Sequence, residues 1–117
     1  MRARHRVREL AQQAGLRLVD QTKFVTAVSE LGRNTVIHGG GGHLTSGLLD
    51  NAGRMGVWAM FEDDGPGIPD VQLALTDGYS TGHGLGLGFG GARRLVGEFE
   101  VRSKPAGGTV VRVATWR

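Results

Sequence analysis

The sequence predicts an α/β fold, a two-layer α/β sandwich in which helices cover one antiparallel sheet. Two N-terminal segments place apolar residues at steps of three and four, which is the period of an amphipathic helix. Later segments alternate apolar and polar residues, as half-buried strands do, and turn-forming residues join them in pairs. Because the two kinds of element are separated along the chain, we expect one layer of each.

Two long helices are predicted first. Residues 4–18 form one helix, with an apolar face made of Val7, Leu10, Ala11, Ala14 and Leu18. Asp20 is expected to cap a second helix that runs to about His38, where the glycines of residues 39–42 stop it. Its buried stripe is Phe24, Val25, Val28, Leu31, Thr35 and Val36. Shorter helices are expected at residues 70–75 and 90–96.

Four strands are predicted, in two hairpins. Residues 43–49 and 56–61 are joined by the turn-rich residues 50–54, and the second strand delivers Asp63 just after its end. Residues 98–102 and 109–115 alternate like paired strands about a turn at residues 105–108.

The composition fits a single domain over residues 1–117. Hydrophobic residues make up 39% of the chain and charged residues 21%, as in ordinary globular proteins, and the length excludes a second catalytic domain. Without cysteine, the chain can form neither a disulfide nor a thiolate metal site. The apolar runs are too short for a bilayer, and Met1 leads into charged residues. The sequence therefore predicts a cytoplasmic protein without a membrane partner.

The positive charge is weak evidence for a nucleic-acid partner. The formal net charge is +3, and 12 of the 14 cationic residues are arginine. These arginines are scattered, except at the start of the chain, whereas nucleic-acid binding favours a clustered basic face. We therefore expect no nucleic-acid partner.

Glu30, Asn34 and His38 follow one another at intervals of four, so they rise along one face of the second helix. An asparagine oxygen is a suitable ligand for Mg²⁺, which keeps most of its waters and shares its site with substrate phosphates. A partly buried Glu30 is a reasonable general base for a hydroxyl or a water. The alternative is the solvated side of an amphipathic helix, and only the segments downstream argue against it.

Asp63 stands at a strand end beside the Gly65-Pro66-Gly67 turn. A carboxylate accepts hydrogen bonds, so it suits the exocyclic amino group of adenine, and a planar base can slide against a glycine turn. The alternative is an ordinary surface turn, since Asp, Gly and Pro are common turn residues.

The glycines of residues 82–91 indicate a phosphate-binding loop. Gly86, Gly88 and Gly91 match the dinucleotide-binding spacing, but a polar stretch precedes them instead of a buried strand, which argues against that fold. The chain also has no Walker lysine motif, which excludes a P-loop enzyme. A loop that closes over a triphosphate is the better interpretation.

Three segments together resemble the N, G1 and G2 boxes of the Bergerat-type (GHKL) ATPases, the superfamily of sensor histidine kinases and topoisomerase ATP domains. They are Glu30–Asn34 with His38 and Gly39, then Asp63–Ile68, then Gly82–Leu87. Within that superfamily, residues 78–81, Arg94-Leu95, Glu98-Phe99 and Gly107-Gly108-Thr109 resemble the RsbT-like anti-sigma regulatory factors and switch-protein serine kinases.

The resemblance implies a role for each matching position. Glu30 would be the catalytic base toward a substrate serine, Asn34 would bind Mg²⁺, and Asp63 would bind the adenine amino group of ATP. Thr109 would support the adenine site. The remaining nucleotide-binding positions that it implies are His38, Gly65, Gly67, Ile68, Gly82, His83, Gly84, Leu85, Gly86 and Leu87.

The resemblance also implies a function. Family members transfer the terminal phosphate of ATP to a serine or threonine of a small STAS-domain antagonist, which releases a sigma factor or frees the kinase to activate a phosphatase of the PP2C type. Two alternatives stay open. One is an ATP-binding anti-sigma factor that acts mainly by sequestration, and the other is a severed histidine-kinase ATP domain.

The start of the chain departs from the family pattern. Family members usually open with a strand before the first helix, whereas here Met1 falls almost on that helix. We therefore expect a single histidine-kinase-like domain whose sheet lacks the N-terminal edge strand, with a truncated start as the alternative. An unpaired edge favours association of two copies, so a homodimer is a further expectation.

Overall fold

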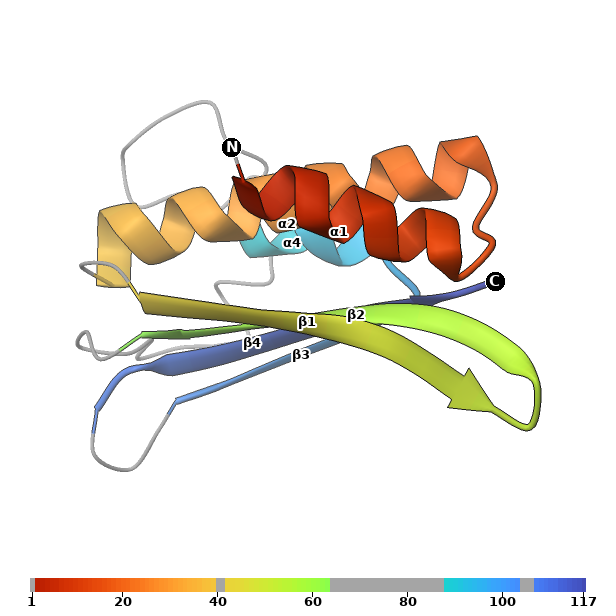
Figure 1. The fold of residues 1–117 in the computed structure, drawn as a ribbon. Helices are drawn as coiled ribbons and strands as arrows, with labels where there is room; N and C mark the ends of the chain where they lie inside the picture. Colours follow the sequence, from red (N-terminus) through yellow and green to blue (C-terminus); the bar gives the residue numbers. More distant parts are fainter. Residues whose placement is uncertain (1, 40–41, 64–87, 104–106) are drawn as a thin grey trace.

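The computed structural model describes residues 2–39, 42–63, 88–103 and 107–117. The elements in chain order are α1 (Arg2–Gln13), α2 (Leu18–Gly39), β1 (Gly42–Asn51), β2 (Arg54–Asp63), α4 (Gly88–Arg94), β3 (Glu98–Ser103) and β4 (Thr109–Trp116). The helices α1, α2 and α4 lie on one face of the sheet (Figure 1). The expected two-layer α/β sandwich is confirmed. The helix expected at residues 70–75 lies outside the described residues.

Within the described residues the sheet has four antiparallel strands in the order β1-β2-β4-β3. Both predicted hairpins are present. The turn between β1 and β2 is shorter than predicted, because Asn51 pairs with Arg54 and only Ala52 and Gly53 remain between the strands. Two residues is the commonest length for such a turn. The pairing of β2 with β4 joins the two hairpins into one sheet.

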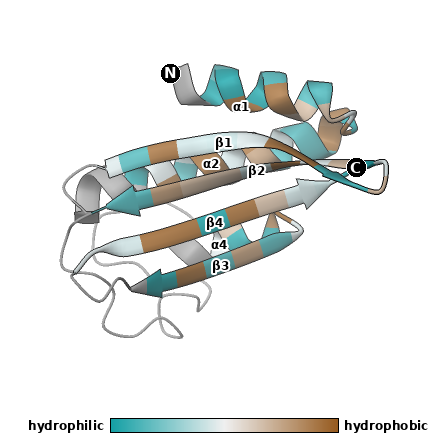
Figure 2. Cartoon of the chain, turned by 60° about the horizontal axis from the view of Figure 1, so that its bottom comes forward, coloured by the Kyte–Doolittle hydropathy of each residue, from teal (hydrophilic) through white to brown (hydrophobic). Residues whose placement is uncertain are grey.

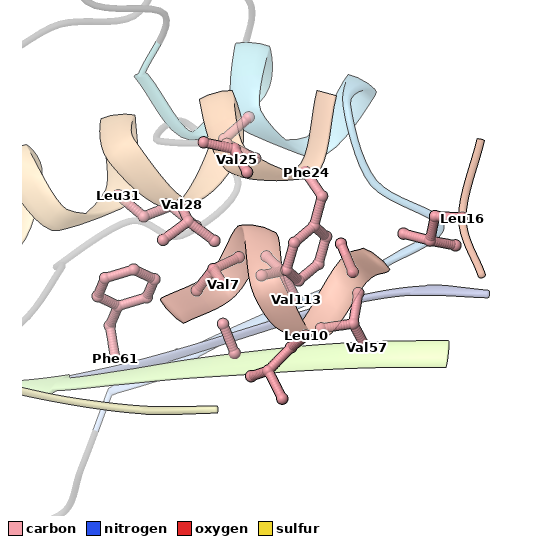
Figure 3. Close-up of a cluster of buried hydrophobic side chains, with 14 of the residues drawn as sticks. Val7, Leu10, Leu16, Phe24, Val25, Val28, Leu31, Val57, Phe61 and Val113 are labelled. Carbon is pink, nitrogen blue, oxygen red and sulfur yellow. The ribbon is translucent and has the colours of Figure 1, made fainter. Parts of the chain in front are cut away.

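The core lies between the sheet and the helices (Figure 3). On β2, Val57, Ala59 and Phe61 are buried at every second position, as the period of a strand requires. They meet buried residues of α1, α2 and β4, which include Val7, Leu10, Phe24, Val25, Val28, Leu31, Val111 and Val113. The predicted apolar faces of the first two helices are therefore confirmed over these positions.

The predicted boundary between the first two helices was wrong. Gly15 has φ +80°, and the Leu16 N–H donates to the Ala11 carbonyl at 3.1 Å, which closes α1 at Gln13. Leu18 consequently begins α2, and its side chain is 71% exposed instead of belonging to the apolar face of α1. Asp20 lies within the first turn of α2 and does not cap it from outside. It accepts a hydrogen bond from Arg17 at 3.1 Å.

The strand ends and the last helix agree with the prediction to within two residues. The helix expected at residues 90–96 is α4, Gly88–Arg94. β1 is an edge strand among the described residues, and the expected lack of a further strand beside it stays a prediction. None of the helices in the described part of the chain is long and apolar enough to cross a membrane.

The face of the sheet away from the helices is turned forward in Figure 2, and on it Gly56 of β2 pairs with Trp116 of β4. A Cβ atom built on Gly56 would lie 2.9 Å from Cε3 of Trp116 and 3.0 Å from the Thr115 carbonyl oxygen. The Trp116 indole cannot move away easily. Its N–H donates to Glu98 at 2.6 Å, and the Arg54 guanidinium lies 5.6 Å from the ring centroid.

We therefore expect Gly56→Ala to lower the free energy of unfolding by about 1–3 kcal/mol, because overpacking a fixed contact forces neighbouring atoms apart. Chemical denaturation measures the change. Gly97→Ala is the matched control, since the nearest atom to its added Cβ would be the Ala114 carbonyl oxygen at 3.5 Å, an ordinary contact. Equal stability of the two variants would contradict this account of the Gly56 contact.

Candidate active site

The C-terminal half of α2 carries the polar positions that the sequence singled out. Glu30, Asn34 and His38 all lie within α2, and each is about 6 Å further along the helix axis than the one before. Glu30 is next to Leu31, whose side chain is 1% exposed and packs in the core. The packing of Leu31 in the core therefore fixes the part of α2 that carries Glu30. The side chains of Asn34 and His38 lie outside the described part of the structure.

The Glu30 carboxylate is half-buried and engaged by an arginine. The side chain of Glu30 is 21% exposed, and its Oε2 accepts a hydrogen bond of 2.6 Å from Nη2 of Arg33, one turn further along α2. Sequence reasoning did not single out Arg33. The spacing of three residues from Glu30 is the signal that could have found it, because such residues are neighbours on a helix.

Asp63 is the last residue of β2 and pairs with two other elements. Its register partners are Gly42, at the start of β1, and Thr109, at the start of β4. Asp63 continues the alternation of Val57, Ala59 and Phe61, so its side chain leaves the sheet on the side of the helices. The strand thus presents a carboxylate to the helix layer, at the end of the sheet.

Thr109 lies opposite Asp63 on the neighbouring strand. Thr109 is 6% exposed, and among the described residues it is the one polar residue that is buried. Gly107 and Gly108 precede it, and both have φ +98°, a conformation that residues with a side chain rarely adopt. This turn brings the chain into β4 with Thr109 beside Asp63. The resemblance implied that placement, whereas the role of Thr109 in binding a nucleotide stays a prediction.

These groups gather at one end of the molecule. α2 ends at Gly39, close in sequence to the start of β1, and β1 begins opposite the end of β2. In Figure 1 the C-terminal end of α2, the end of β2 and the start of β4 all lie at the left-hand end of the sheet. Asn34 and His38 are therefore on the part of α2 nearest to Asp63 and Thr109.

The glycine boxes lie outside the described residues. They comprise Gly65, Gly67 and Ile68 after Asp63, and Gly82, His83, Gly84, Leu85, Gly86 and Leu87 before α4. The helix that follows the second box, α4, packs against α2. The described residues on either side of this stretch are Asp63, which ends β2, and Gly88, which begins α4. Both therefore belong to the packed framework of sheet and helices.

The residue types at positions 34, 63 and 109 suit a magnesium nucleotide. A carboxylate acceptor at position 63 and a hydroxyl at position 109 match the hydrogen-bonding edge of an adenine. One amide oxygen at position 34 is a sufficient protein ligand for a Mg²⁺ ion that is bound mainly by phosphates and water. Glu30 lies one turn before Asn34 on α2.

Comparison with known proteins agrees with this geometry. The family model for the histidine kinase-, DNA gyrase B- and HSP90-like ATPases matches residues 19–117. The serine/threonine-protein kinase RsbT of Bacillus subtilis (strain 168) is 39% identical to the chain over 114 residues, which cover 97% of this chain and 86% of RsbT. The chain therefore belongs to the histidine kinase-, DNA gyrase B- and HSP90-like ATPase family and, within it, to the RsbT-like serine/threonine-protein kinases.

Proposed function

We propose that the chain binds MgATP at the end of its sheet and transfers the terminal phosphate to a serine or threonine of a STAS-domain antagonist in a partner-switching pathway. The observation that carries this proposal is the register of β2 and β4, which pairs Asp63 with the buried Thr109 at the end of the molecule reached by the C-terminal half of α2. The 39% identity to RsbT supports the choice of a protein substrate.

Each residue has a distinct part in this proposal. Asp63 accepts a hydrogen bond from the adenine amino group, and Thr109 supports that contact. Asn34 would hold Mg²⁺, which would neutralise phosphate charge, and backbone amides at Gly82, Gly84 and Gly86 would bind the phosphates. His38, Gly65, Gly67, Ile68, His83, Leu85 and Leu87 line the nucleotide.

Glu30 acts on the substrate hydroxyl. Its carboxylate accepts the hydroxyl proton as the serine oxygen bonds to the γ-phosphorus, and the bond from that phosphorus to the bridging oxygen of ADP breaks. Phosphoryl transfer requires mainly positioning and charge stabilisation, and Mg²⁺ held by Asn34 would supply part of the latter.

The physiological setting follows from the same proposal. The phosphorylated antagonist releases a sigma factor or frees this kinase to activate a PP2C-type phosphatase, in the cytoplasm. A homodimer is the proposed state of the kinase. The main alternative is an anti-sigma factor that binds ATP and acts by sequestration, and the presence of Glu30 favours the kinase, because a binder of that kind has no use for a base.

Incubation with radiolabelled ATP, Mg²⁺ and each STAS-domain protein of the same genome tests the proposal. We expect one of these proteins to become labelled on a serine or threonine, and the label to disappear when that residue is replaced by alanine. Binding of ATP without transfer to any of them would favour the sequestration alternative. Labelling of a histidine in this chain or in another protein would favour the severed histidine-kinase domain.

A further inference from the structure

The structure connects Arg33 to the proposed base. We propose that Arg33 is a positioning residue, which holds the Glu30 carboxylate in the orientation that accepts the substrate proton. This inference rests on the proposed function, since it assigns a role to a neighbour of the catalytic base. Its starting point is the hydrogen bond of 2.6 Å between Nη2 of Arg33 and Oε2 of Glu30.

This ion pair differs from two other ion pairs between residues three apart in the described part of the chain. In α1, Arg6 and Glu9 lie 3.7 Å apart and the glutamate is 61% exposed. At the start of α2, Arg17 and Asp20 lie 3.1 Å apart and the aspartate is 28% exposed. The Arg33–Glu30 pair is shorter than both, and its carboxylate is the least exposed of the three. Charge-assisted hydrogen bonds of this length are among the stronger ones in proteins.

The pair contributes little to the stability of the fold. Arg33 is 49% exposed, and ion pairs with an exposed partner typically contribute about 0–1 kcal/mol to folding. The position of the pair is more informative. Arg33 directly precedes Asn34, the proposed magnesium ligand, so the guanidinium lies at the part of α2 where triphosphate and base are expected to meet.

Two physical effects make such an arginine useful to a base. A glutamate side chain has several rotatable bonds, and fixing it for each turnover costs up to about 2 kcal/mol of rotamer entropy unless a neighbour already holds it. The carboxylate must also stand near the anionic γ-phosphate, which repels it, and an adjacent guanidinium reduces that repulsion. Both effects act on the transfer step, whereas neither contributes to binding of the adenine.

We expect Arg33→Ala to lower kcat for phosphoryl transfer about tenfold, because small misplacements of a reacting group are costly, and to leave KM for ATP within about twofold. Arg33→Lys should recover part of the loss, since a lysine keeps the charge but lacks the planar fork. Arg17→Ala is the matched control. It removes the corresponding ion pair with Asp20 at the start of the same helix, and we expect wild-type kcat.

Single and double variants distinguish a failure of the positioning role of Arg33 from a failure of Glu30 as the base. If Arg33 acts through Glu30, adding Arg33→Ala to Glu30→Gln should cause no further fall in kcat. A wild-type rate for Glu30→Gln would refute the base itself. A severe loss in Glu30→Gln together with a wild-type kcat in Arg33→Ala would refute the positioning role alone. A similar rise in KM for ATP in both Arg33 variants would show that the arginine binds the nucleotide instead.

The contact can also be measured without a protein substrate. In the wild-type chain, ¹⁵N NMR of the arginine side chains should show a guanidinium with slowed rotation and slowed proton exchange, assigned to Arg33 by its loss in Arg33→Lys. In Glu30→Gln this signal should lose its slowed rotation and slowed exchange, and it should overlap the signals of the solvent-exposed arginines. An Arg33 signal that does not change in Glu30→Gln would overturn the inference, whatever the transfer assay gives.

Discussion

Replacing Glu30 with glutamine is expected to reduce phosphoryl transfer by between about 100-fold and 10,000-fold, the usual contribution of a general base. Glutamine keeps the shape of the side chain and can still occupy its place on α2, but its neutral amide cannot accept the hydroxyl proton. The affinity for MgATP should change by less than about threefold. Steady-state transfer to the labelled STAS protein, with calorimetric titration of the nucleotide, measures both quantities.

A control variant must distinguish the effect on the transfer rate of losing an ion pair from the effect of losing the base. Glu30→Gln also removes the hydrogen bond from Arg33, so the control needs a carboxylate with a similar partner. Asp20→Asn provides it, because Asp20 lies on the same helix and accepts from an arginine three residues away. We expect Asp20→Asn to transfer phosphate at the wild-type rate. If Glu30→Gln did so as well, another group would have to be the base.

The layers of this fold could be predicted because their signals are local. The apolar positions of α1 and α2 recur at the helical period, and the hairpins are set by short turns between alternating segments. The boundary near Leu18 was missed because it depends on a left-handed Gly15 and on a hydrogen bond between Leu16 and Ala11. Apolar periodicity alone continues across that boundary without a break.

The site was predictable only in part, for a similar reason. Four-residue spacing shows that Glu30, Asn34 and His38 share a face of a helix, whatever the rest of the fold does. The pairing of Asp63 with Thr109 joins strands from different hairpins, so no local pattern encodes it, and only the family resemblance implied it. Arg33 escaped notice because a surface arginine on a polar helix face is ordinary until its partner is known.

Asp63→Asn is expected to weaken ATP binding by between about 10-fold and 100-fold, the range for losing a hydrogen bond to a charged acceptor. The amide oxygen is a neutral acceptor, and the amide nitrogen, when turned toward the base, would oppose the adenine amino group. Calorimetric or fluorescence titration measures the affinity. A melting curve should accompany it, because Asp63 belongs to a strand that pairs on both sides.

The neighbouring carboxylate supplies the control. Glu62 precedes Asp63 on β2, and successive side chains of a strand leave it on opposite faces, so Glu62 belongs to the face away from the helices. We expect Glu62→Gln to bind ATP as the wild type does. Equal losses in the two variants would indicate a general effect of charge at this end of the sheet instead of a contact with the base.

A nucleotide that lacks the amino group tests the contact itself. The wild-type chain should bind purine riboside triphosphate, which has a hydrogen in place of the 6-amino group, about as weakly as Asp63→Asn binds ATP, because each change removes one half of the same hydrogen bond. In Asp63→Asn the two nucleotides should then bind with similar affinity. Such non-additivity is the signature of two groups in direct contact. If the variant still preferred ATP by the wild-type factor, Asp63 would not be the residue that recognises adenine.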